Sequence, residues 1–188
     1  MTRLFIALPI DEAIRSRLLP LHRFFCDWSG IIKPVNPSRF HITIKFIGEC
    51  EGNTARAIEE AFLNIPVDTA ALEYTVKGIG MFPGEKNPSV IWTGLQADLT
   101  RIRKMLNVIE SFTKEFGIKE ETRSFIPHLT IGRVRKGRKL TAKIYDYLEQ
   151  YRDTDFGSSI FTRLILYQSK LSPEGPEYTA RKELPLAR

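Results

Sequence analysis

The sequence predicts an α+β fold with a mainly antiparallel sheet and two similar halves. Two observations favour this fold. First, the segment that links the alternating stretches 72–79 and 89–94 is too short for a helical crossover, which antiparallel neighbours do not need. Second, the string His-apolar-Thr-Ile occurs twice, at 41–44 and at 128–131, and each copy lies among similar elements. Such an internal repeat indicates a pseudo-twofold arrangement in which the two strings face each other.

The first half is predicted to run strand, helix, strand, helix. Residues 3–9 form a buried strand, and Asp11 caps a helix that runs through Phe25, with Pro20 kinking or interrupting it. Residues 31–38 are rich in turn residues, and 39–47 form the first motif strand. A second helix starts at Asn53 or Thr54, because the apolar residues that follow recur at helical spacing.

The second half repeats this alternation. Strands at 72–79 and 89–94 flank a loop rich in glycine and proline, and residues 98–116 form a long amphipathic helix. Pro127 introduces the second motif strand, 128–134, which leads through a basic loop into a helix near 141–152. The chain closes with one long strand at 159–170 and a shorter strand near 177–183. We expect a single domain over residues 1–188.

Composition permits a nucleic-acid partner without requiring one. The 188 residues carry a formal net charge of +6, and 27% of them are charged. A basic balance of this size suits RNA or DNA, although many basic proteins bind neither. Cys26 and Cys50 lack any paired spacing, which predicts a reducing compartment without a disulfide framework.

The sequence also predicts a protein that is not attached to a membrane. The apolar N-terminal run is short, and Asp11 and Glu12 follow it at once without a small-residue cleavage site, so a signal peptide is disfavoured. No segment approaches the ~20 apolar residues of a membrane span. We therefore expect a cytoplasmic protein.

The two repeated strings carry the candidate chemistry. Residues i and i+2 of a strand point to the same face, so each string presents an imidazole and a hydroxyl side by side. The unperturbed pKa of histidine, ~6.5, allows one neutral and one protonated imidazole near neutral pH. His41 and His128 therefore suit acid–base cleavage of a phosphodiester. Thr43 and Thr130 can donate hydrogen bonds to the non-bridging oxygens.

Two other interpretations of the histidines are disfavoured. A single histidine on a strand is usually a core or surface residue, and only the recurrence with matching neighbours favours catalysis. His22 has no partner motif and is interpreted as structural. A metal site is also disfavoured, because two histidines alone rarely hold zinc and neither string contains Asp, Glu or Cys. We expect neither metal nor cofactor.

The motifs and their flanks resemble the 2H phosphoesterase superfamily, and within it the RNA 2′,3′-cyclic phosphodiesterases, also called 2′-5′ RNA ligases. The resemblance covers nearly the whole chain. It is carried by the opening strand, both motif strands, the strand between them and the closing turn, at 3–7, 41–48, 88–92, 127–133 and 172–178. It implies a bilobal, pseudo-twofold 2H phosphoesterase fold with antiparallel sheets, outer helices and a central cleft.

The resemblance also implies a reaction. This is metal-independent hydrolysis of a terminal 2′,3′-cyclic phosphate on RNA to a 2′-phosphomonoester, with His128 as the base on water and His41 as the acid to O3′. Pseudo-symmetry leaves the two roles exchangeable. Joining of a cyclic end to a 5′-hydroxyl is implied as a minor activity. We expect the protein to be a monomer. Two alternatives stay open: a related enzyme on ADP-ribose cyclic phosphate or 2′-5′ oligoadenylate, and a non-catalytic module that binds RNA ends.

Residues near the motifs are candidates for substrate contact. Arg133 is expected to bind the phosphate if Gly132 introduces a bulge or the strand ends there, because its odd offset from His128 otherwise places it on the other face. Phe46 is predicted to pack in the core, with base stacking as the alternative. Lys45 is expected to share the face of His41. Further candidates for RNA contact come from the basic loop; they are Arg135, Lys136 and Arg138. Trp92 and Tyr178 are interpreted as core or turn residues.

Overall fold

The computed structural model describes residues 1–68, 70–172 and 175–186. The strands are β1 (Thr2–Pro9), β2 (Ile32–Pro34), β3 (His41–Cys50), β4 (Leu72–Phe82), β5 (Val90–Ala97), β6 (His128–Val134), β7 (Asp155–Phe161), β8 (Arg163–Ser172) and β9 (Gly175–Pro185). The α-helices are α1 (Glu12–Arg17), α2 (Leu19–Asp27), α3 (Gly52–Ala61), α4 (Leu99–Lys114) and α5 (Ala142–Glu149). Short 3-10 turns are η1 (Pro37–Arg39) and η2 (Phe62–Asn64).

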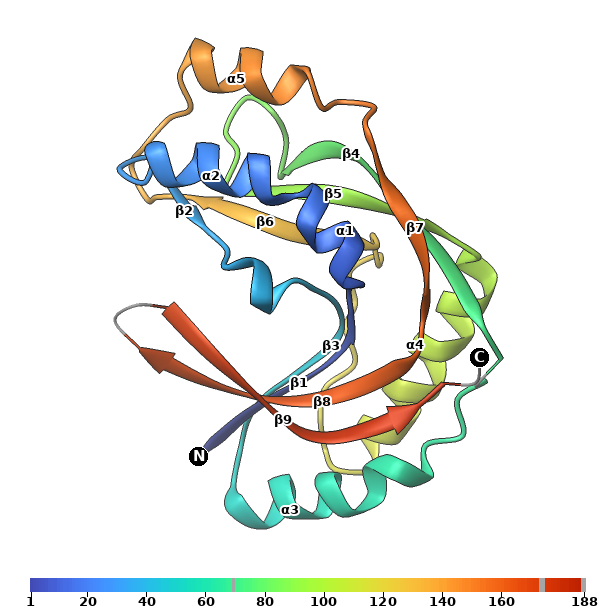
Figure 1. Cartoon of the computed structure of the whole chain (residues 1–188). Coiled ribbons are helices and arrows are strands. Elements are labelled where there is room, and N and C mark those ends of the chain that lie inside the picture. Colours follow the sequence, from blue (N-terminus) through green and yellow to red (C-terminus); the bar gives the residue numbers. More distant parts are fainter. Residues whose placement is uncertain (69, 173–174, 187–188) are drawn as a thin grey trace.

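Within these residues the strands form one sheet in the order β7-β4-β5-β6-β3-β1-β8-β9, with β2 paired to β6 (Figure 1). Every pairing is antiparallel. The α+β prediction is therefore confirmed. The two motif strands, β3 and β6, are neighbours at the centre of the sheet, and they join its two halves through Ile42 and Leu129.

The two halves in space are not the two halves of the chain. One half contains β3, β1, β8 and β9, and helices α3 and α4 pack on β1 and β3. The other half contains β6, β5, β4 and β7, and helices α2 and α1 pack on β6 and β7. Helices α1 and α2 from the first half of the sequence thus cover strands of the second half, and α4 from the second half covers β3 of the first (Figure 1). This exchange buries the aliphatic face of both motif strands in one core that includes Ile42, Ile44, Leu129 and Ile131.

Three predicted elements differ from the structure. The expected strand at 159–170 is two strands, β7 and β8, which separate at Thr162 and belong to opposite ends of the sheet. The turn-rich segment 31–38 contains the short strand β2. The first helix breaks at Leu18 instead of at Pro20, which lies in the first turn of α2, where its missing N–H breaks no helical hydrogen bond. Asp11 caps α1 as expected, accepting from the backbone N–H of Ala13.

No helix in the described part of the chain is long and apolar enough to cross a membrane.

Candidate active site

The pairing of β3 with β6 brings the two repeated strings together. Ile42 is the register partner of Leu129. In an antiparallel ladder, the neighbouring pairs are then His41 opposite Thr130 and Thr43 opposite His128. Because side chains alternate between faces, all four point away from the buried Ile42 and Leu129. One face of the sheet centre, which we call the histidine face, therefore carries both imidazoles and both hydroxyls.

Both imidazoles are held in the same way. Nδ1 of His41 lies 2.6 Å from the carbonyl oxygen of Arg39, and Nδ1 of His128 lies 2.7 Å from that of Ile126. A carbonyl oxygen only accepts, so Nδ1 is the donor in each ring. Nε2 of each ring is left to accept a proton when the imidazole is neutral and to donate one when it is charged. The equal offset of the two carbonyls, two residues before each histidine, extends the pseudo-symmetry to the backbone.

Aromatic side chains pack on both imidazoles. The ring of His41 lies 5.1 Å from that of Phe5 and 5.4 Å from that of Tyr178. The ring of His128 lies 4.9 Å from that of Phe82 and 6.2 Å from that of Trp92. The interpretation of Trp92 and Tyr178 as core or turn residues missed this role, because their approach to the histidines depends on strand pairing between distant segments.

The same burial changes the acid–base properties of the pair. Desolvation lowers the pKa of His41 to about 4, and the positive charge of Arg133 and the imidazole of His128 contribute to this lowering. Desolvation also lowers the pKa of His128, and Arg133 again contributes. Coupling of both histidines to one guanidinium indicates that all three groups lie in one small region. Both imidazoles are therefore poised to be neutral until an anion binds between them.

A β-bulge decides where Arg133 lies. On β6, Gly132 pairs with Ile91 and Thr130 with Trp92, so Ile131 is an extra residue on β6. Because the extra residue shifts the alternation of side chains by one position, Arg133 lies on the histidine face, where it is exposed. The sequence predicted that such a bulge could occur at Gly132, and the structure has it one residue earlier, at Ile131. Phosphate binding by Arg133 stays a prediction that this placement supports.

The first motif strand has the matching bulge. On β3, Thr43 pairs with Ala7 and Lys45 with Ile6, so Ile44 is the extra residue. Ile44 and Ile131 each follow a motif histidine by three positions. Phe46 therefore occupies on β3 the place of Arg133 on β6, and 62% of its surface is exposed. The prediction that Phe46 packs in the core is wrong; base stacking, the alternative, remains open.

The bulge at Ile44 also turns Lys45 away from the histidine face. Lys45 is buried, with 4% of its surface exposed. Its Nζ donates to Oε2 of Glu110 on α4 at 2.6 Å and to the carbonyl oxygen of Lys119 at 2.7 Å. The prediction that Lys45 shares the face of His41 is therefore wrong, and RNA contact by its ammonium group is excluded in this structure. The group instead ties β3 to α4.

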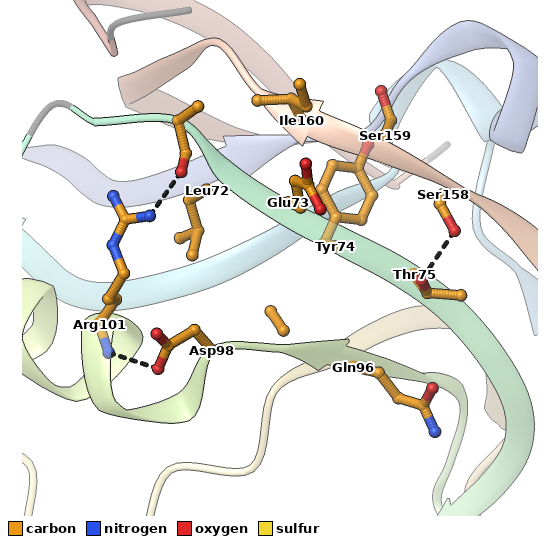
Figure 2. Close-up of a pocket in the computed structure, with 12 residues that line it drawn as sticks. Leu72, Glu73, Tyr74, Thr75, Gln96, Asp98, Arg101, Ser158, Ser159 and Ile160 are labelled. Atoms are coloured by element: carbon orange, nitrogen blue, oxygen red, sulfur yellow. Dashed lines mark hydrogen bonds between the residues drawn. The ribbon is translucent and has the colours of Figure 1, made fainter.

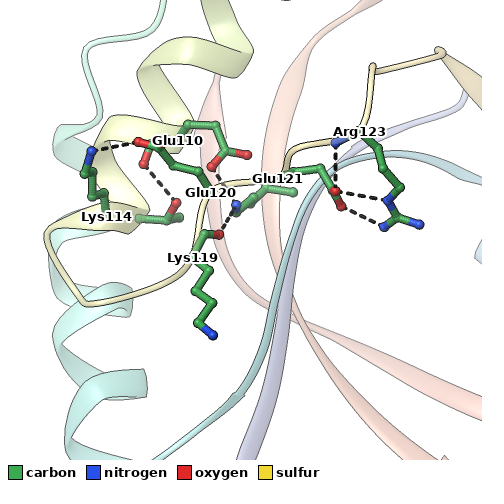
Figure 3. Close-up of polar contacts among 8 residues, drawn as sticks. Glu110, Lys114, Lys119, Glu120, Glu121 and Arg123 are labelled. Carbon is green, nitrogen blue, oxygen red and sulfur yellow. Dashed lines mark hydrogen bonds and ion pairs between the residues drawn. The ribbon is translucent and has the colours of Figure 1, made fainter.

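Lys45 also anchors the segment that leads to His128. Lys119 belongs to the loop between α4 and β6, which carries further ion pairs, Lys114 with Glu120 and Arg123 with Glu121 (Figure 3). Those pairs are exposed and each contributes little to stability. The buried ammonium is the stronger constraint, because it loses both hydrogen bonds if the loop moves.

Replacing Lys45 by methionine should destabilise the fold without changing substrate affinity. Removing one partner of a buried pair leaves Glu110 and the Lys119 carbonyl without their donor, at a cost of about 3 kcal/mol in the free energy of unfolding. Urea titration followed by circular dichroism measures this loss. Lys104→Met, on the same helix as Glu110, is the matched control. A Lys45→Met protein of unchanged stability and weakened RNA binding would contradict this placement.

The basic loop lies at the outer end of β6. Arg135 donates from Nε to the carbonyl oxygen of Ser29 at 2.6 Å, beyond the end of α2. Lys136 and Arg138 are exposed. These three side chains are therefore displaced along β6 from the histidines, and RNA contact by them remains a prediction.

The described residues gather no cluster of metal-ligating side chains. Among them, no three His, Cys, Asp or Glu side chains gather where they could hold a metal ion. A cavity of about 710 Å³ lies elsewhere, on strands β4, β5 and β7 (Figure 2). No motif residue lines it, and its Arg101 donates to the carbonyl oxygen of Ala71. This cavity is separate from the candidate active site.

Two histidines with free Nε2 atoms, two threonines and an antiparallel pseudo-twofold sheet together define a phosphoesterase of the two-histidine class. Comparison with known proteins agrees. The family model described as LigT like Phosphoesterase matches residues 8–92, which include the first motif strand. A relative from Methanocaldococcus jannaschii named RNA 2′,3′-cyclic phosphodiesterase is 35% identical over 183 residues, or 96% of this chain and 99% of the relative. The chain belongs to the LigT-like phosphoesterases, a 2H family.

Further relatives agree in length and fold. A protein of the same name from Archaeoglobus fulgidus is 31% identical over 94% of this chain and 96% of its own. The crystal structure of TT0787 from Thermus thermophilus superposes with a TM-score of 0.80 at 24% identity, covering 98% of this chain and 97% of that one. Escherichia coli LigT, crystallised with 3′-AMP, superposes with a TM-score of 0.76 at 20% identity, covering 100% and 99%. The fold predicted from the motif resemblance is confirmed.

Proposed function

We propose that this protein hydrolyses the terminal 2′,3′-cyclic phosphate of RNA to a 2′-phosphomonoester, without a metal ion and as a single bilobal domain. The observation that carries the proposal is the register of Ile42 with Leu129, which sets two Nδ1-anchored imidazoles and two hydroxyls on one face. The names of the relatives support the choice of a cyclic phosphate on RNA.

In this proposal each histidine performs one proton transfer. Neutral His128 removes a proton from water as the water oxygen attacks phosphorus. The P–O3′ bond breaks, and protonated His41 gives its proton to O3′, which leaves as a hydroxyl. Each transfer contributes roughly 10²–10⁴ in rate. Thr43, Thr130 and Arg133 hold the non-bridging oxygens as negative charge grows on them.

The lowered pKa values fit this cycle when the substrate is included. In the free protein the pKa of His41 is about 4, so this ring is neutral at neutral pH. A phosphate anion beside the ring favours the charged form and raises that pKa. Binding of the substrate therefore favours the protonated form of His41, which is the form that can donate a proton to O3′. The same two groups, with roles exchanged, support joining of a cyclic end to a 5′-hydroxyl as a minor activity.

Incubation with 2′,3′-cyclic AMP in EDTA tests the proposal. We expect full turnover in the chelator and 2′-AMP as the product, because the acid is directed at O3′. Phosphorus NMR distinguishes the 2′ and 3′ isomers. Formation of 3′-AMP would reverse the assigned leaving group, and loss of activity in EDTA with recovery on adding a divalent cation would overturn the metal-free mechanism.

A further inference from the structure

The side chains of Lys33 and Arg39 are cations near the histidines that have no part in the mechanism above. Lys33 on β2 is the register partner of Arg133 on β6, so both side chains lie on the histidine face. Arg39 ends η1, two residues before His41. A Cβ placed on Gly175, at the start of β9, would lie 3.4 Å from Nη1 of Arg39 and 3.5 Å from Nζ of Lys33. Two cationic groups from different segments thus converge on one point.

Two further guanidinium groups adjoin this pair. The positive charges of Arg133, Arg39 and Arg3 all act on the hydroxyl of Tyr178, each opposing the rise in its pKa that burial causes. Register supports the same placement, since Arg3 pairs with Ser169 on β8, which pairs with Tyr178 on β9. The ring of Tyr178 in turn lies 5.4 Å from that of His41. Arg3, Lys33, Arg39 and Arg133 therefore form a cationic cluster that borders the candidate active site directly.

The cations of the cluster form no ion pair within the part of the chain that the structure describes. No ion pair found there involves Arg3, Lys33, Arg39 or Arg133. The acidic residue nearest in register is Glu49, opposite Arg3. Four like charges held together repel one another, and the repulsion is relieved when a bound anion supplies the missing charge.

A cyclic phosphate alone does not match this charge. It carries one negative charge, which Arg133 and the two threonines already address. Lys33 and Arg39 lie to one side, against β9, where a second anion attached to the same substrate would meet them. An RNA strand supplies such an anion at every nucleotide.

We propose that Lys33 and Arg39 form a second anion subsite, which binds the phosphodiester linking the terminal nucleotide to its 5′ neighbour. The subsite makes the enzyme selective for RNA of two or more nucleotides over cyclic mononucleotides. Arg39 thereby has two functions: its carbonyl orients His41, and its side chain holds the strand. This inference rests on the proposed function and names the substrate length that it favours.

The test compares two substrates that differ by one phosphodiester: 2′,3′-cyclic AMP and the dinucleotide ApA with a 2′,3′-cyclic end. The wild-type protein should show a higher kcat/KM for the dinucleotide. Lys33→Gln and Arg39→Gln should each lower the dinucleotide-to-mononucleotide ratio of kcat/KM about tenfold. Each should also flatten the salt dependence for the dinucleotide, by roughly 0.7 in log–log slope per lost phosphate contact. Arg39→Gln keeps the backbone carbonyl that holds His41.

Lys170→Gln is the matched control. This exposed lysine lies opposite Glu177 in the register of β8 with β9, outside the cluster. Its ratio should equal that of the wild type. An unchanged ratio in Lys33→Gln and Arg39→Gln, or equal wild-type rates on both substrates, would overturn the subsite. Failure of the proposed function would look different, with no turnover of either substrate. Fluorescence anisotropy with a labelled ApApApA 2′-phosphate then still reports the subsite, through a several-fold weaker Kd in the variants or, against the proposal, an unchanged one.

Discussion

Replacing either motif histidine by alanine should lower kcat on a cyclic-ended dinucleotide by roughly 10²–10⁴-fold, the contribution of one positioned acid or base. The two losses should be similar, because the structure holds both rings in the same way. Each Nδ1 donates to the carbonyl two residues earlier, and each ring packs on aromatic side chains. Steady-state rates on His41→Ala and His128→Ala measure this effect.

The third histidine is the control for this experiment. His22 lies on α2 and belongs to neither motif string. His22→Ala should therefore keep wild-type kcat, while circular dichroism verifies that all three variants are folded. Full activity in a folded His41→Ala or His128→Ala protein would remove that residue from the reaction.

Replacing Arg133 by glutamine should have the second-largest effect, a fall in kcat/KM of about 10²–10³-fold. The charge of this guanidinium acts on both histidines. In the proposed reaction its loss also removes a donor to the oxygens on which charge develops. Arg56→Gln, an exposed arginine on α3, is the control and should behave like the wild type.

The same variant should shift the pH profile. Arg133 lowers the pKa of both histidines, so its removal raises both. The wild-type kcat/KM follows a bell whose two limbs report the pKa values of the histidine pair in the free protein. Both limbs therefore lie below the ordinary histidine value of ~6.5, and the lower one lies near pH 4. In Arg133→Gln both limbs should move to higher pH. An unmoved bell of reduced height would mean that Arg133 lies farther from the pair than its charge effects indicate.

The sequence alone predicted the motif chemistry because that chemistry is local. Alternation within each string fixes which side chains share a face with His41 and His128, and the repeat itself indicates that the two strings meet. The same rule was wrong for Lys45 and Phe46. It assumes an unbroken ladder, and the extra residue Ile44 reverses the faces on which Lys45 and Phe46 lie.

Such a bulge has no clear signature in β3. Ile44 is a β-branched residue of the kind that regular strands favour, and only the pairing with the partner strand shows that it is the extra residue. On β6, the glycine at 132 suggested an irregularity, and the bulge was found at the adjacent Ile131. A comparison of the two strings could have helped, since Phe46 and Arg133 hold equal offsets and must lie on equivalent faces if the halves are related by a twofold axis.

The remaining features of the site depend on pairings between distant segments. Tyr178, Trp92, Lys33 and Gly175 approach the histidines through β9, β5, β2 and their partners, and no local pattern predicts those registers. The break at Thr162 is of the same kind. The sequence predicted one strand over 159–170, whereas the chain there leaves one end of the sheet and joins the other.

In the proposed reaction one histidine gives a proton to O3′ while the other takes one from water at the same phosphorus. A cyclic substrate with sulfur in place of O3′ separates these two roles, since a thiolate, with a pKa of ~8.5 in its conjugate acid, leaves without a proton donor. His41→Ala should recover most of its lost rate on the sulfur substrate, and His128→Ala should not. Recovery by His128→Ala alone would exchange the two roles; equal impairment of both variants on both substrates would contradict acid–base catalysis by the pair.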